Sequence, residues 1–124
     1  MSQGCDVNST NTSGFASAIQ KANESDYVIL MLGLDTSVES ENLDRTNISL
    51  PGVQQQFADE ILALGKPTSV VLINGGSVAI SQLKETAPAI VEAFYPGTRG
   101  GDAIAQVLFG DFNPGMLANP LFCL

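Results

Sequence analysis

The 124-residue sequence has no histidine and no tryptophan, and only two cysteines. Without histidine, the chain cannot form a Ser-His-Asp or Cys-His catalytic system, nor a zinc site that uses histidine. Two cysteines are too few to hold a structural zinc ion by themselves. These absences exclude several of the commonest catalytic and metal-binding arrangements.

Basic residues are also scarce, because five Lys and Arg stand against thirteen Asp and Glu, for a formal net charge of −8. A nucleic-acid site needs a basic surface that displaces the counterions of the phosphates. Binding to an anionic membrane likewise needs a basic protein surface. No apolar run approaches the roughly 20 residues of a membrane-spanning helix. We therefore expect no nucleic acid and no membrane as partner, and one globular domain over residues 1–124.

The cysteines and asparagines bear on the cellular compartment. Cys5 and Cys123 lie near opposite ends of the sequence and could form one disulfide or remain two free thiols. Acceptor sites of the form Asn-x-Ser/Thr occur at Asn8, Asn11, Asn23 and Asn47. Such sites are typical of a secreted glycoprotein, which we expect, although no signal segment opens this sequence. The alternative is a surface that is simply rich in Asn, Ser and Thr.

Apolar periodicity predicts alternating helices and strands. Helices are expected over residues 14–24, 51–64, 77–84 and 102–109. Strands are expected over residues 27–32, 70–73 and 89–94. The continuous apolar run of the first strand is typical of a parallel strand covered by helices on both faces. The order predicts an α/β fold, a three-layer α/β/α sandwich with a mainly parallel sheet.

This predicted order begins with a helix, and a sheet of three strands is small. Both features indicate part of a larger α/β domain that lacks an edge strand on its N-terminal side. An unpaired edge leaves backbone donors and acceptors open to another chain. We therefore expect either self-association through that edge or marginal stability of the chain.

Ligands of open parallel sheets bind beyond the carboxyl ends of the strands, and three loops follow those ends here. The first loop, residues 34–50, carries five charged side chains of interest: Asp35, Glu39, Glu41, Asp44 and Arg45. Carboxylates in this position suit proton transfer or hydrogen bonding to sugar hydroxyls. The alternative is a solvated acidic loop in which Asp44 or a glutamate pairs with Arg45.

The other two loops, residues 74–77 and 95–101, are rich in glycine. They lack the Gly-x-Gly-x-x-Gly and Lys-Ser/Thr spacings of phosphate-binding loops, so we expect no nucleotide site. A tight turn or a close approach to a ligand would each explain Asn74-Gly75-Gly76. For residues 95–101, a turn is preferred over an anion site made by backbone amides.

Seven short strings of the sequence occur in the order found in a known family. They cover residues 32–35, 39–45, 48–54, 65–67, 71–76, 93–104 and 108–114. Together they resemble the C-terminal α/β-sandwich domain of glycoside hydrolase family 3, the β-glucosidases and β-xylosidases, over roughly residues 14–115. The Glu-x-Glu-x-x-Asp-Arg spacing is most similar to the β-xylosidase-like branch.

The resemblance implies part of a retaining, exo-acting β-glycosidase that uses no metal or organic cofactor. In this family a (β/α)₈ barrel carries the nucleophilic aspartate, and the sandwich domain supplies the acid/base glutamate. Glu39 matches the acid/base position, with Glu41 as the fallback, and Asp44 and Arg45 match a pair that we interpret as holding the loop. The implied partners are a β-linked oligosaccharide or glycoside and the barrel, which this sequence lacks. We therefore expect the isolated chain to be inactive.

Some alternatives stay open. The residues after Pro114 depart from the family's usual Gly-Gly-Lys/Arg-Leu-Pro ending. The sequence does not separate glucosides from xylosides as substrates, because most sugar contacts would come from the barrel. A non-catalytic carbohydrate-binding or scaffold module of the same fold is the alternative function.

Overall fold

Helices and strands alternate along the chain in the computed structural model, which describes residues 1–114. In order they are α1 (Phe15–Asn23), β1 (Val28–Gly33), α2 (Gln54–Leu62), β2 (Thr68–Ile73), α3 (Ser81–Thr86), β3 (Ala89–Glu92) and α4 (Gly100–Leu108). The sheet has the order β1-β2-β3, and both neighbouring pairs are parallel. The α/β fold predicted from periodicity is confirmed. Over these same residues, no helix combines the length and apolar content that crossing a membrane requires.

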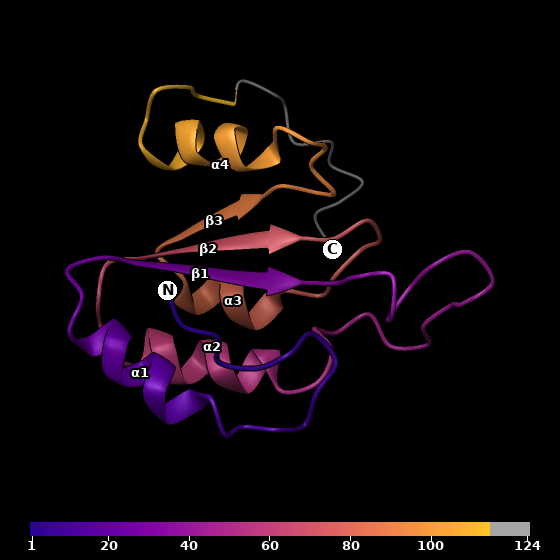
Figure 1. Cartoon of the computed structure of the whole chain (residues 1–124), viewed down its shortest axis with the longest axis horizontal. Helices are drawn as coiled ribbons and strands as arrows, with labels where there is room; N and C mark the ends of the chain where they lie inside the picture. The colour runs from indigo at the N-terminus through magenta and orange to yellow at the C-terminus, as the bar shows by residue number, and fades with distance from the viewer. Residues whose placement is uncertain (115–124) are drawn as a thin grey trace.

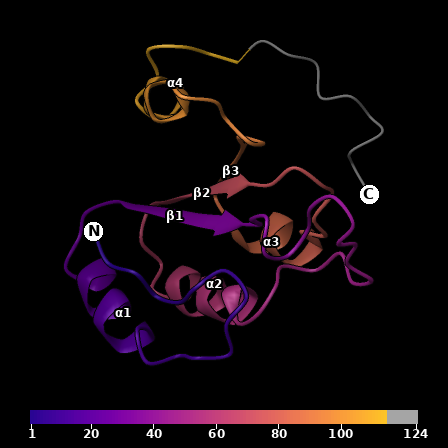
Figure 2. The ribbon, with the colours of Figure 1, turned by 45° about the vertical axis from the view of Figure 1, so that its right-hand side comes forward.

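Helices lie on both faces of the sheet. Figure 1 shows α1, α2 and α3 together on one face and α4 on the other, beside β3, and the turned view in Figure 2 agrees. The core lies between the sheet and the group of three helices, and its larger members include Phe15, Leu30, Leu32, Phe57, Ile61, Val70, Leu72 and Leu83. The rings of Phe15 and Phe57 pack with their centroids 4.9 Å apart. The spacing of Phe57 and Ile61 places both on one face of α2, as predicted.

The first strand is buried on one face only. Leu30 and Leu32 are buried, whereas Ile29 and Met31 are 43% and 52% exposed. The expectation that this apolar run is covered on both faces is therefore wrong within residues 1–114. The reason is the unequal distribution of helices, because α4 stands over the β3 side of the sheet and leaves that face of β1 open (Figure 1).

The second helix begins later than predicted. Gly52 adopts a left-handed conformation with φ +59°, and the N–H of Val53 donates to the carbonyl oxygen of Ser9 at 3.0 Å. Pro51 therefore precedes the helix, and the expectation that Pro51 lies in its first turn is wrong. The left-handed residue expected after this helix is confirmed, since Gly65 has φ +67°.

The third helix also begins later than expected. Ala79 forms an isolated parallel bridge with Ser49, and its N–H donates to the carbonyl oxygen of Ile48 at 2.8 Å. This pairing with residues 34–50 keeps residue 79 extended. The helix therefore begins at Ser81 rather than near residue 77.

Strands β1 and β3 form the two edges of the described sheet. Each edge leaves backbone groups without a strand partner among residues 1–114, which is the condition for pairing with a second chain. Self-association through an edge stays a prediction.

Two expectations concern the ends of the sequence. Cys123 and the unusual residues after Pro114 lie outside the described residues, so the pairing of Cys5 with Cys123 stays open. Cys5 packs against the core, and this burial, together with the negative charge of Asp6, raises the pKa of its thiol.

Candidate functional site

The loops that follow the three strands begin side by side at one end of the sheet (Figure 1). Gly33, at the end of β1, pairs with Ile73, and Leu72 of β2 pairs with Glu92 at the end of β3. Residues that follow these ends are therefore brought together although they are far apart in sequence. This is the edge at which parallel sheets bind ligands.

A buried glutamine fixes the point where the first loop leaves the sheet. Gln54 accepts a hydrogen bond from the N–H of Gly33 and donates to the carbonyl oxygens of Gly33 and Val7, each at 2.8 Å. The N–H of Leu34 donates to the carbonyl oxygen of Ile73 at 2.8 Å. Gln54 ends the family string over residues 48–54, which was the available signal, but the sequence alone assigned it no role.

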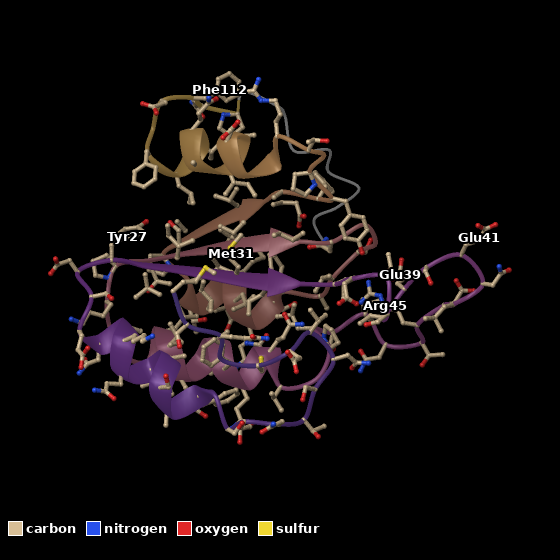
Figure 3. All side chains as sticks on the ribbon, viewed as in Figure 1. Tyr27, Met31, Glu39, Glu41, Arg45 and Phe112 are labelled. Carbon is tan, nitrogen blue, oxygen red and sulfur yellow. The ribbon has the colours of Figure 1, made fainter. Side chains whose placement is uncertain are left out.

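Glu39 and Arg45 point toward each other at the base of the loop (Figure 3). Arg45 forms an ion pair with Glu39 through its Nε atom. The same guanidinium group donates from Nη2 to the carbonyl oxygen of Ser77 and from Nη1 to that of Asn47, the latter at 3.5 Å. The Arg45 side chain is 11% exposed and that of Glu39 is 32% exposed. Arg45 thus joins the acidic loop to residues 74–77.

The other acidic residues assigned to the site lie away from this ion pair. Residues 40–43 close a tight turn, and Figure 3 shows Glu41 at the far end of the loop, pointing away from Glu39. Asp44 is exposed, and in residues 1–114 no ion pair joins it to Arg45. Of the two candidate acid/base residues, the structure brings Glu39 to the strand ends and leaves Glu41 in solvent.

The turn at Asn74-Gly75-Gly76 allows two side chains to approach its backbone. A side chain at Gly76 would overlap the carboxylate of Glu39, and one at Gly75 would overlap the ring of Tyr95. Asn74 is only 4% exposed, and its Nδ2 donates to the carbonyl oxygen of Gly76 at 3.0 Å. A side chain at either position would therefore force Glu39 or Tyr95 to move.

A second carboxylate that no motif identified lies at the end of β3. Glu92 Oε1 accepts a hydrogen bond from the N–H of Phe94 at 3.1 Å. Burial raises the pKa of Glu92, with opposing contributions from that N–H and from the Asn74 side chain. Phe94 has φ +52°, so the strand ends at Glu92 and not at residue 94 as predicted. The sequence feature that could have identified Glu92 is its position as a lone acidic residue in an apolar strand.

The chemistry open to this site is proton transfer and hydrogen bonding. Among residues 1–114, no group of three or more Cys, Asp or Glu side chains is placed to hold a metal ion. Glu39 is partly exposed and is oriented by a guanidinium group, an arrangement compatible with general acid/base catalysis. Glu92 ends β3, and the exposed ring of Tyr95 belongs to the loop that follows this strand.

The sequence matches the model of the glycosyl hydrolase family 3 C-terminal domain over residues 2–118. It is 44% identical over 113 residues to a β-xylosidase of Formosa agariphila, a match that covers 91% of this chain and 16% of that protein. It is 41% identical over 97 residues to a periplasmic β-glucosidase of Salmonella typhimurium, covering 78% of this chain and 13% of that protein. A solved family 3 exo-β-xylosidase, in complex with a xylobiose aziridine activity-based probe, superposes with a TM-score of 0.86 at 37% identity. That superposition covers 89% of this chain and 15% of the exo-β-xylosidase.

Proposed function

The chain belongs to the glycosyl hydrolase family 3 C-terminal domain family, and we propose that it is the acid/base domain of a retaining, exo-acting β-glycosidase. It spans only 13–16% of the length of the three similar proteins. The nucleophilic aspartate is therefore proposed to come from a (β/α)₈ barrel outside this chain. β-Xylosides and β-glucosides are the proposed substrates, since the similar proteins are named as β-xylosidases and a β-glucosidase.

Glu39 is the proposed acid/base. Its carboxyl group would protonate the departing glycosidic oxygen while the nucleophile forms a glycosyl-enzyme. Its carboxylate would then remove a proton from the water that hydrolyses this intermediate. The observation that carries the assignment is the ion pair with Arg45, which holds Glu39 at the strand ends while Glu41 lies at the far end of the loop.

Arg45 is the proposed positioning residue, and within residues 1–114 Asp44 has no comparable contact. The guanidinium group of Arg45 bonds both the carboxylate of Glu39 and the backbone carbonyl oxygen of Ser77. Arg45 would therefore contribute to catalysis by fixing the position of Glu39. A planar guanidinium can hold several acceptors in a fixed geometry, which a flexible lysine ammonium cannot do. The pair predicted to hold the loop is therefore proposed to act mainly through its arginine.

The test is an assay of the complete enzyme that carries this chain. We expect it to hydrolyse an aryl β-xyloside or β-glucoside and to release the β-anomer first, as proton NMR would show, because the mechanism retains configuration. The 124-residue chain alone should show no turnover. A complete protein that binds these sugars and hydrolyses none of them would instead support the non-catalytic carbohydrate-binding or scaffold module.

We also propose that the natural protein is a secreted glycoprotein. All four acceptor asparagines are exposed in the structure: Asn8, Asn11, Asn23 and Asn47. Exposure supports the proposal because a bulky polar glycan needs a surface position. Enzymatic removal of N-linked glycans from native material should lower its mass. An unchanged mass, with all four asparagines unmodified in peptide maps, would contradict the proposal.

A further inference from the structure

The turn beside Glu39 also supports an exposed aromatic ring. Glu39 lies against Gly76 and the Tyr95 ring lies against Gly75, and consecutive Cα atoms are only about 3.8 Å apart. Tyr95 is 49% exposed although one edge of its ring packs on the turn. A molecule that reaches the carboxyl group of Glu39 would therefore pass close to this ring.

Two further polar side chains lie next to the same turn. Asn74 is 96% buried, and its Oδ1 has no hydrogen-bond partner among the described residues. Glu92 is a partly buried carboxylate whose pKa is raised by that burial. An unsatisfied buried amide oxygen costs stability, and such groups, like carboxylates with a raised pKa, concentrate at binding and catalytic sites.

The backbone between these groups is strained. Phe94 is a bulky residue with φ +52°, a conformation that such residues rarely adopt. Its N–H bonds Glu92, and its side chain is 48% exposed next to Tyr95. Two exposed aromatic side chains therefore follow directly after the carboxylate of Glu92. A ligand with an apolar C–H face and hydroxyl groups at its edge fits this combination.

We propose that Tyr95, Glu92 and Asn74 form a subsite for the sugar unit that leaves the reaction. The Tyr95 ring would stack on the C–H face of the sugar, and Glu92 would accept a hydrogen bond from a hydroxyl group. Asn74 is buried beneath these two side chains, where it holds the turn through Gly76 and bonds the carboxylate of Glu92. We assign the leaving sugar unit to this subsite because the subsite lies beside Glu39. Glu39 is proposed to protonate the glycosidic oxygen, and that oxygen stays with the leaving unit. This inference rests on the proposed function for its substrate class.

The test is a titration of the isotope-labelled 124-residue chain with methyl β-xyloside and with xylobiose, followed by two-dimensional amide NMR. We expect the amide signals of residues 74–76 and 92–95 to shift together and to saturate. Glycerol at the same concentration is the control for general effects of hydroxyl compounds. The absence of saturable shifts, or shifts scattered over the whole surface, would overturn the subsite.

Matched variants assign the binding to side chains. Tyr95→Ala should weaken the affinity about tenfold, and Tyr95→Leu, which keeps an apolar contact with Gly75, should do the same. Tyr27→Ala is the control, because Tyr27 is 53% exposed and lies at the opposite end of β1 from Glu39 (Figure 3). It should leave the affinity unchanged. Native affinity in folded Tyr95→Leu would overturn the role of the ring.

Glu92→Gln tests the carboxylate separately. Because burial raises the pKa of Glu92 in the folded chain, ionisation lowers stability as the pH rises through that pKa. A neutral glutamine avoids this effect, so the variant should be at least as stable as the native chain at neutral pH. Its affinity for methyl β-xyloside should fall several-fold, because a charge-assisted hydrogen bond becomes a neutral one. Unchanged affinity would remove Glu92 from the subsite.

The titration and the test of the proposed function fail independently. The titration needs neither the barrel nor a catalytic step, whereas the enzyme assay does not depend on Tyr95. Hydrolysis by the complete enzyme without saturable shifts in the chain would overturn only the subsite. Saturable shifts without hydrolysis would overturn the proposed catalysis and leave a sugar-binding surface.

Discussion

Replacing Glu39 with alanine in the complete enzyme should slow hydrolysis of xylobiose by about 10²–10⁴-fold, the usual contribution of general acid/base catalysis. The sugar leaving group of xylobiose departs slowly unless its oxygen is protonated. An activated aryl xyloside needs no such proton, so it should still form the glycosyl-enzyme. Added azide should then restore turnover of the aryl xyloside, because a small anion attacks the intermediate without a general base. Measurements of kcat and kcat/KM on both substrates check this result.

Glu41→Ala is the matched control. It removes the same chemical group from the same loop, two residues further along, where the side chain points away from Glu39 (Figure 3). We expect near-native kcat on xylobiose and no rescue by azide. If Glu41→Ala shows the rescue and Glu39→Ala keeps near-native activity, the acid/base is Glu41. If neither variant matters, the acid/base lies outside this chain.

The order of helices and strands could be predicted because it depends on local periodicity. Phe57 and Ile61 recur at helical spacing, and the apolar runs that became β1 and β2 are bounded by turn residues. Gly65 could be placed after a helix because a left-handed residue is favoured there. These signals need no knowledge of distant parts of the chain.

Boundaries and burial depended on distant contacts, which periodicity does not contain. Ala79 was predicted to be helical, but its bridge with Ser49 holds it extended. Ile29 and Met31 are as apolar as their neighbours, so the run could not reveal that one face of β1 lies open. Both differences arise from which segments pack together.

The site was predictable to the level of the loop. A cluster of carboxylates after a strand identified residues 34–50, but spacing alone could not decide which acid pairs with Arg45. The pairing of Arg45 depends on residues 74–77, because the carbonyl oxygen of Ser77 accepts a second hydrogen bond from the guanidinium group. Glu92 was missed because its contact with Asn74 arises only from the pairing of β2 with β3.

The structure also singles out the point at which the loop is attached to the sheet. Gly33 has φ +147°, and a side chain there would overlap the carbonyl group of Ile73. Its N–H and carbonyl oxygen both bond the buried side chain of Gln54. A substitution at Gly33 would strain the backbone and separate it from Gln54. The effect should therefore extend to the loop that carries Glu39.

Gly33→Ala should lower the free energy of unfolding of the 124-residue chain by about 3–4 kcal/mol, since backbone strain costs about 1–3 kcal/mol and a broken buried hydrogen bond a similar amount. Gly65→Ala isolates the strain, because φ is +67° but no atom of the described residues lies within 4 Å of an added Cβ. It should lower the free energy by about 1 kcal/mol. Gly101→Ala, in the exposed first turn of α4, where no atom of residues 1–114 lies within 4 Å of an added Cβ, should raise the free energy of unfolding by up to about 1 kcal/mol. Urea unfolding followed by circular dichroism measures the free energy of unfolding of all three variants.

A free energy for Gly33→Ala within about 0.5 kcal/mol of the native chain would contradict this argument, because surface substitutions without such contacts fall in that range. It would mean that neither the Ile73 carbonyl group nor Gln54 constrains residue 33.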